Sequence, residues 1–140
     1  SIRESDKVHA VEVARSLVSM GFTVFTTRGT RELLAAHSVD TDLIRKISEG
    51  ARPNILDKIA SREIDLIINT PTHTGAQTDE GQIRAMAVGA RIPMITTITG
   101  ARAAVQAIEA LRGGTWQVSA LQDYFTNAED SEHLKHDTVQ

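Results

Sequence analysis

The stretch "IDLIINT", residues 64–70, indicates the fold class of this chain. It is almost continuously apolar, which is typical of a parallel strand that helices cover on both faces. Similar runs predict strands at 22–26 ("FTVFT") and 93–97 ("PMITT"), and a more ambiguous run predicts one at 43–47. Helical spacing fills the segments at about 8–18, 30–36, 54–63, 79–88 and 100–111. Ser5 or Asp6 can cap the first of these helices and Gly21 can end it, and Asn54 can cap the third. Strands that alternate with helices predict a single α/β domain built on a parallel sheet.

Three of the predicted strands end in small hydrogen-bonding residues. Ligands of open parallel α/β sheets bind beyond the carboxyl ends of the strands, so these residues are expected at one edge of the sheet. Hydroxyls, an amide and the N–H groups of helix starts favour a phosphate or another oxyanion there. Lys7, at the start of the first helix, is expected beside the same edge. The strand-end candidates are Thr27, Arg28, Gly29, Thr30, Asn69, Thr70 and Thr72.

Each of these candidates also has a purely structural interpretation. Gly29 can make a tight turn, and Thr30 can cap the helix that follows it. Lys7 can be a solvated surface charge, and Lys46 can be one on an edge strand. Asn69 and Thr70 can form a turn before a proline. The residue types alone leave both interpretations open.

Composition excludes several classes of function. The 140 residues are 41% hydrophobic and 24% charged, with a net charge of -3, so the chain has no bulk attraction for nucleic acid or an anionic membrane. The absence of cysteine excludes disulfides and thiolate metal sites, and favours a reducing, cytoplasmic compartment. No apolar run approaches the roughly 20 residues of a membrane span. The five histidines lack ligand spacing with carboxylates, so no metal site is predicted.

The two ends of the chain differ from its middle. Residues 1–125 are predicted to form the domain. Residues 126–140, "TNAEDSEHLKHDTVQ", lack a periodic apolar face and are predicted to be a disordered tail. The first helix begins almost at Ser1, so we expect the chain to be an excised piece of a longer protein.

Five stretches, in this order and spacing, resemble the C-terminal regulatory domain of the carbamoyl-phosphate synthase large subunit, which has the methylglyoxal-synthase-like fold. They are "SIRESDK" (1–7), "TTRGT" (26–30), "IRKISEGARPNILDKI" (44–59), "LIINTPT" (66–72) and "TTITGA" (96–101). The resemblance extends from Ser1 to about Tyr124. Any one motif alone would be weak, but the combination is specific.

The resemblance implies a Rossmann-like domain with one five-stranded parallel sheet flanked by helices, whose first strand would lie mostly before Ser1. It implies no catalysis in this domain. Instead it implies binding of a nucleotide effector such as UMP or IMP, and regulation of the upstream synthetase domains. The phosphate-binding positions of the family fall on Lys7, Thr27 and Thr30. The remaining effector contacts fall on Lys46, Asn69 and Thr70, with Thr72 compensating for the polar residue that Pro71 replaces.

The parent enzyme implied by the resemblance is an ATP-dependent ligase of pyrimidine and arginine biosynthesis. It would use ATP with Mg or Mn in its synthetase domains, and a small glutaminase subunit would be its partner. Met94 and Ile95 stand where enteric members of the family bind ornithine, so a weak response to ornithine is expected.

Methylglyoxal synthase is the competing enzyme hypothesis. That enzyme eliminates phosphate from dihydroxyacetone phosphate with a carboxylate base, which its family carries directly after a Gly-Gly pair. Here the corresponding stretch is "GARPN", and no carboxylate follows before Asp57. A base must lie within hydrogen-bond reach of the proton that it removes. An IMP cyclohydrolase domain, which also opens with "SxxDK", is a weaker alternative, because its later motif has no counterpart here.

Overall fold

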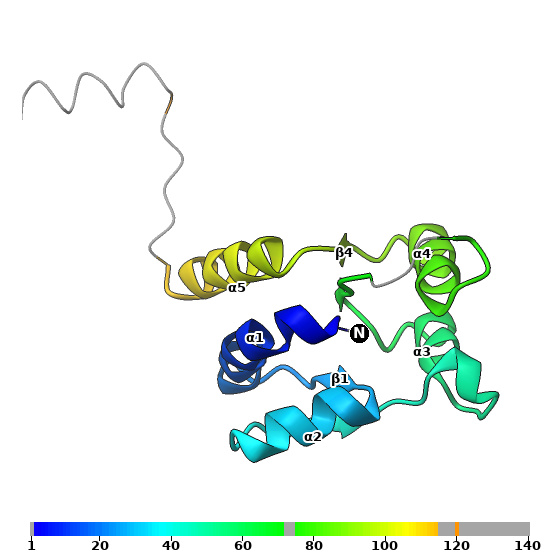
Figure 1. Ribbon diagram of the computed structural model, residues 1–140. Coiled ribbons are helices and arrows are strands. Elements are labelled where there is room, and N and C mark those ends of the chain that lie inside the picture. Colours follow the sequence, from blue (N-terminus) through cyan, green and yellow to red (C-terminus); the bar gives the residue numbers. More distant parts are fainter. Residues whose placement is uncertain (1, 72–74, 115–119, 121–140) are drawn as a thin grey trace, which may run out of the picture. The chain divides into compact units, whose positions relative to one another are not determined.

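The computed structural model describes residues 2–71, 75–114 and 120 (Figure 1). The chain divides into two compact units, residues 1–109 and 110–140. The first unit contains 3-10 helices η1 (Glu4–Asp6) and η2 (Ile47–Glu49), and strands β1 (Phe25–Thr26), β2 (Asp42–Leu43), β3 (Ile67–Ile68) and β4 (Met94–Ile95). Its helices are α1 (Lys7–Ser19), α2 (Arg28–Ala36), α3 (Ile55–Ala60), α4 (Asp79–Ala90) and α5 (Ile98–Arg112), the last of which continues into the second unit. The predicted α/β class is confirmed, whereas the predicted tail lies outside the described residues.

The described strands form two parallel pairs and not one sheet of five. β1 pairs with β2 in the register Phe25↔Asp42, and β3 pairs with β4 in the register Ile67↔Met94. The strand predicted at 43–47 is wrong in its bounds, since β2 ends at Leu43. The chain then forms the tight turn η2, which Gly50 closes at φ 65° in the left-handed region. No five-stranded sheet is therefore formed by the part of the chain that the structure describes.

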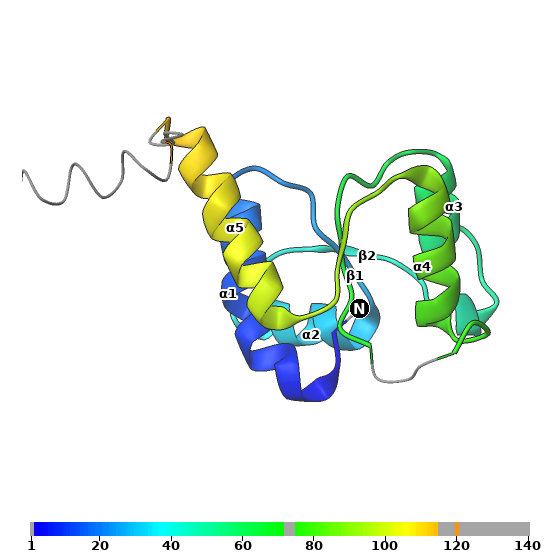
Figure 2. The same ribbon diagram turned by 90° about the horizontal axis from the view of Figure 1, so that it is seen from above.

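Helices cover both faces of the β3–β4 pair, as the apolar run in β3 predicts. One face packs against α1 and α5, and the other packs against α3 and α4, which lie side by side (Figure 2). Consecutive strand residues alternate between the two cores. The first core contains Ile68, Ile95, Val13, Leu17, Ala101 and Val105, and the second contains Ile67, Met94, Ile59, Ile83 and Ala87.

The β1–β2 pair lies between the same layers. Val24, just before β1, packs in the core that α1 and α5 form. The next residue, Phe25, faces α3, where the Lys58 ammonium lies 4.8 Å from the centre of its ring. β1, like the β3–β4 pair, thus lies between α1 and α3, whereas β2 contacts α2.

Several helices end in a left-handed residue that directs the chain into the next segment. At the end of α1, the Phe22 N–H donates to the Leu17 carbonyl at 3.0 Å and Gly21 has φ 84°. This pairing is a Schellman motif, and it confirms the helix stop predicted at Gly21. The left-handed residues after α2, α3 and α4 are Ser38, Arg62 and Arg91. None of them is a glycine, so the sequence gives no glycine signal for these helix ends.

The two glycines of α4 are expected to respond oppositely to substitution by alanine. A Cβ on Gly81 would overlap the Gly75 carbonyl oxygen and lie 2.9 Å from Ala76, whereas a Cβ on Gly89 would meet nothing within 4 Å. Gly81→Ala should lower the free energy of unfolding by about 1–3 kcal/mol, as overpacking does. Gly89→Ala should raise it by about 0.5–1 kcal/mol, because alanine favours helix. Urea unfolding of the two variants checks this, and equal effects would contradict it.

Candidate functional site

A cavity of about 1120 Å³ lies within the first unit, at the carboxyl ends of β1 and β3. It extends from there between the two strand pairs, where apolar side chains of α1 and α5 line it. Arg28 lines a separate, smaller cavity, and Thr72 lies outside the described residues. The predicted site residues that line the large cavity are Lys7, Thr27, Gly29, Thr30, Lys46 and Asn69.

The turn between β1 and α2, which contributes Thr27, Gly29 and Thr30 to this cavity, leaves backbone N–H groups without an intrahelical partner. Thr27 is the N-cap residue of α2, and its side chain makes no capping hydrogen bond. The first intrahelical bond runs from the Arg31 N–H to the Thr27 carbonyl at 2.9 Å. The N–H groups of Arg28, Gly29 and Thr30 therefore come before the first hydrogen bond of the helix. An uncapped helix start of this kind can bind an anion.

Two structural interpretations of this turn are wrong. Thr30 does not cap α2, because the helix begins at Arg28 and Thr30 is its third residue, only 5% exposed. Gly29 does not make a tight turn, because it is the second residue of α2 and does not have a positive φ. Both residues instead lie in the first turn of α2, where Gly29 is beside the Lys7 ammonium.

Lys7 is a half-buried charge and not a fully solvated one. It is the first residue of α1, and its side chain is 21% exposed. Its Nζ would lie 3.8 Å from a Cβ on Gly29, so the ammonium reaches the first turn of α2. Glu4 pairs with it, with Oε2 2.6 Å from Nζ. Lys7 thus brings a positive charge to the uncapped helix start.

Asp6 fixes the position of the turn that carries Lys7. The residue is buried, and its carboxylate accepts a hydrogen bond from Arg3 Nε at 2.7 Å. The Arg3 backbone N–H in turn donates to Thr70 Oγ1 at 2.9 Å, which connects η1 to the end of β3. The hydrogen bond from Arg3 lowers the pKa of Asp6, Thr70 and Ser5 also lower it, and burial opposes them. Sequence reasoning treated Ser5 and Asp6 only as helix caps and missed this connection.

Asn69 carries an unpaired buried acceptor at the cavity. The residue is 1% exposed, and no group of the described chain donates a hydrogen bond to its Oδ1. An unsatisfied buried polar group costs about 1–3 kcal/mol. Thr70, the next residue, is also only 1% exposed. The Asn69 amide is therefore suited to accept a hydrogen bond from a ligand.

Lys46 reaches the cavity from the loop after β2. It is the N-cap residue of η2, and the next turn is attached to the start of α4. The Ser48 N–H and Oγ both donate to Asp79 Oδ2, at 3.2 and 3.0 Å. Asp79 thus does more than complement the dipole of α4, because it holds the loop that carries Lys46.

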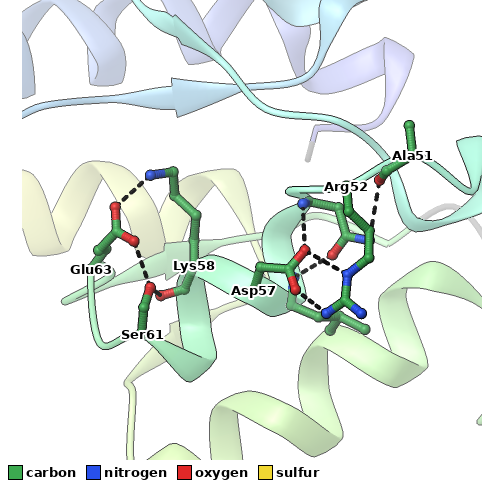
Figure 3. Close-up of polar contacts among 8 residues, drawn as sticks. Ala51, Arg52, Asp57, Lys58, Ser61 and Glu63 are labelled. Carbon is green, nitrogen blue, oxygen red and sulfur yellow. Dashed lines mark hydrogen bonds and ion pairs between the residues drawn. The ribbon is translucent and has the colours of Figure 1, made fainter.

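The start of α3 has the cap that the sequence predicts. Asn54 Oδ1 accepts from the Leu56 N–H at 2.9 Å, and the Asn54 N–H donates to Asp57 at 2.8 Å, which forms a capping box. Arg52 also forms an ion pair with Asp57 (Figure 3). The hydrogen bond from Arg52, followed by that from the Asn54 N–H, lowers the pKa of Asp57. The Asp57 carboxylate is thus engaged in structural contacts.

The described residues contain no group of three or more histidine, cysteine, aspartate or glutamate side chains that could hold a metal ion. In the same part of the chain, no helix has both the length and the apolar character that crossing a membrane requires.

A family model described as an MGS-like domain matches residues 9–96, which include most of the segments that surround the cavity. The chain belongs to the MGS-like domain family. The similarity to curated proteins covers more of this MGS-like domain than the family model does. The chain is 42% identical to a carbamoyl phosphate synthase large chain of Nostoc over 91% of its length. Two further relatives are C-terminal sections of carbamoyl phosphate synthase large chains. The domain is 43% identical to the section from Methanocaldococcus jannaschii and 45% identical to the section from Methanopyrus kandleri, over 88% of the domain's length in each case.

The MGS-like domain spans only part of these relatives. It covers 11% of the Nostoc protein, 20% of the Methanocaldococcus protein and 23% of the Methanopyrus protein. The family expected from the sequence motifs is thus confirmed.

Proposed function

We propose that this MGS-like domain binds the phosphate of a nucleotide effector, such as UMP or IMP, at the carboxyl ends of β1 and β3. The observation that carries the proposal is the unpaired, buried Oδ1 of Asn69, which lines the same cavity as the Lys7 ammonium. The N–H groups at the start of α2 lie beside that ammonium. A phosphate would accept from Lys7 and these N–H groups, while the rest of the ligand would donate to Asn69.

We also propose that the domain acts within a carbamoyl phosphate synthase large chain. The names of the relatives support this assignment. In such a protein the domain would regulate the synthetase domains upstream of it, which would use ATP with Mg or Mn. A small glutaminase subunit and a cytoplasmic location belong to the same proposal.

Calorimetric titration of the 140-residue chain with UMP, IMP and uridine tests the effector proposal. At least one of the nucleotides should bind, and uridine, which lacks the phosphate, should bind much more weakly. Affinity for the nucleotide should also fall as salt rises, because the phosphate contacts are electrostatic. Uridine that binds as tightly as UMP would contradict the proposal.

We propose that the domain does not itself catalyse phosphate elimination as methylglyoxal synthase does. Asp57, the first carboxylate after the "GARPN" stretch, is held by Arg52 and by the Asn54 N–H, so it is not available as a base. Incubation with dihydroxyacetone phosphate should release phosphate no faster than buffer does. Turnover by the pure protein would instead favour the enzyme hypothesis.

We further propose that the two strand pairs belong to one five-stranded parallel sheet, in which an additional strand lies between β1 and β3. The carbonyls of Val24 and Thr26 accept hydrogen bonds from the side of β2, so Phe25, between them, directs its backbone groups to the opposite edge. Residues of β1 and β3 line the cavity that separates the pairs. Both strands end beside η1 and the start of α1, so they run in the same direction. In a longer protein, the segment that leads into Ile2 would supply the additional strand.

A further inference from the structure

We propose that Glu4 competes with the effector phosphate for Lys7 and thereby sets the affinity of the site for anions. This inference rests on the phosphate site proposed above. Glu4 Oε2 lies 2.6 Å from Lys7 Nζ, so the ammonium that would bind the phosphate already has a carboxylate partner. Glu4 is thus an internal counter-ion at the position where the ligand would bring its own negative charge.

The carboxylate and the phosphate would approach Lys7 in the same small region. The Lys7 ammonium reaches the first turn of α2, where the uncapped N–H groups of Arg28, Gly29 and Thr30 lie. An ammonium has three donors, but its single charge cannot neutralise both a carboxylate and a dianionic phosphate. The two anions would repel each other at this short range. Binding of the phosphate therefore favours release of Glu4.

The exposure of the two partners makes this exchange possible. The Glu4 side chain is 87% exposed, so it can return to water without a large cost. Lys7 is only 21% exposed, so it remains at the site. The neighbouring acid, Asp6, is buried and held by Arg3 at 2.7 Å, so it is not free to replace Glu4 on the ammonium. Glu4 is the exchangeable carboxylate of this turn.

Glu4→Gln removes the competing charge and nearly keeps the shape of the side chain. Exposed ion pairs are worth up to about 1 kcal/mol, so UMP should bind up to about fivefold more tightly to this variant in calorimetry at low salt. Glu12→Gln is the matched control. Glu12 lies on α1 and is 66% exposed, and it too has a basic partner, but that partner is Arg102 at 3.9 Å. Its replacement should change the affinity by less than about twofold.

A double-mutant cycle separates competition at Lys7 from a general change in charge. In the Lys7→Ala background, Glu4→Gln should no longer tighten binding, because the shared partner is gone. A gain that persists without Lys7, or Glu4→Gln binding UMP no more tightly than the unchanged chain, would overturn the inference and leave the proposed function in place. Absence of binding of both UMP and IMP, to the unchanged chain and to Glu4→Gln, would overturn the proposed function as well.

Discussion

Lys7→Ala should weaken the binding of UMP by roughly 10-fold to 100-fold. A hydrogen bond to a charged group contributes about 1.5–3 kcal/mol, and each 1.4 kcal/mol corresponds to a factor of ten in affinity. Lys7 would contribute such a bond from a half-buried side chain, where the charge is screened less than at the surface. Calorimetric titration of the variant with UMP measures the loss.

Arg15→Ala is the matched control for this prediction. Arg15 also lies on α1 and also carries one positive charge, but its guanidinium donates to the His37 carbonyl at 3.1 Å. It is not among the residues that line the cavity, so its loss should change the affinity by less than about twofold. Lys7→Ala that binds UMP as tightly as Arg15→Ala does would place the phosphate elsewhere.

If this domain is part of a longer protein, as proposed, a chain extended by the residues before Ser1 should be more stable by several kcal/mol. The additional strand would place apolar side chains in the cavity between β1 and β3, and each fully buried valine, leucine or isoleucine contributes about 1.5–3 kcal/mol. Urea unfolding of the two chains gives the difference. The dependence of the free energy of unfolding on urea concentration (the m value) should also rise, because the extended chain exposes more surface on unfolding.

The control for the extended chain replaces the apolar residues of the extension by serine. This variant has the same length but little to bury, so it should be no more stable than the 140-residue chain. If the unmodified extension also fails to raise the free energy of unfolding, the two strand pairs do not share a missing strand.

Local patterns predicted much of the fold, because their causes lie within a few residues of each other. Gly21 ends α1 through hydrogen bonds that close within one turn. The Asn54 cap depends on Leu56 and Asp57, which follow directly in the sequence. The apolar run before Asn69 indicated a strand covered on both faces, and β3 packs between two helical layers.

Contacts between distant residues were not predictable in the same way. Whether strand pairs join into one sheet depends on what lies between them, which no single strand reveals. At the site, the first turn of α2 was misplaced because Thr27 and Thr30 are both good cap residues, and only the backbone decides between them. The connection from Arg3 to Thr70 spans 67 positions in the sequence, so no local pattern could indicate it.

The proposed function depends on a phosphate binding at the start of α2, beside Lys7. Amide NMR spectra of the labelled 140-residue chain, recorded during titration with UMP, test it most directly. The backbone N–H signals of Arg28, Gly29 and Thr30 should shift together and saturate with the same dissociation constant, and uridine should leave them in place. If UMP binds while these three signals do not move, the phosphate site is not at this turn.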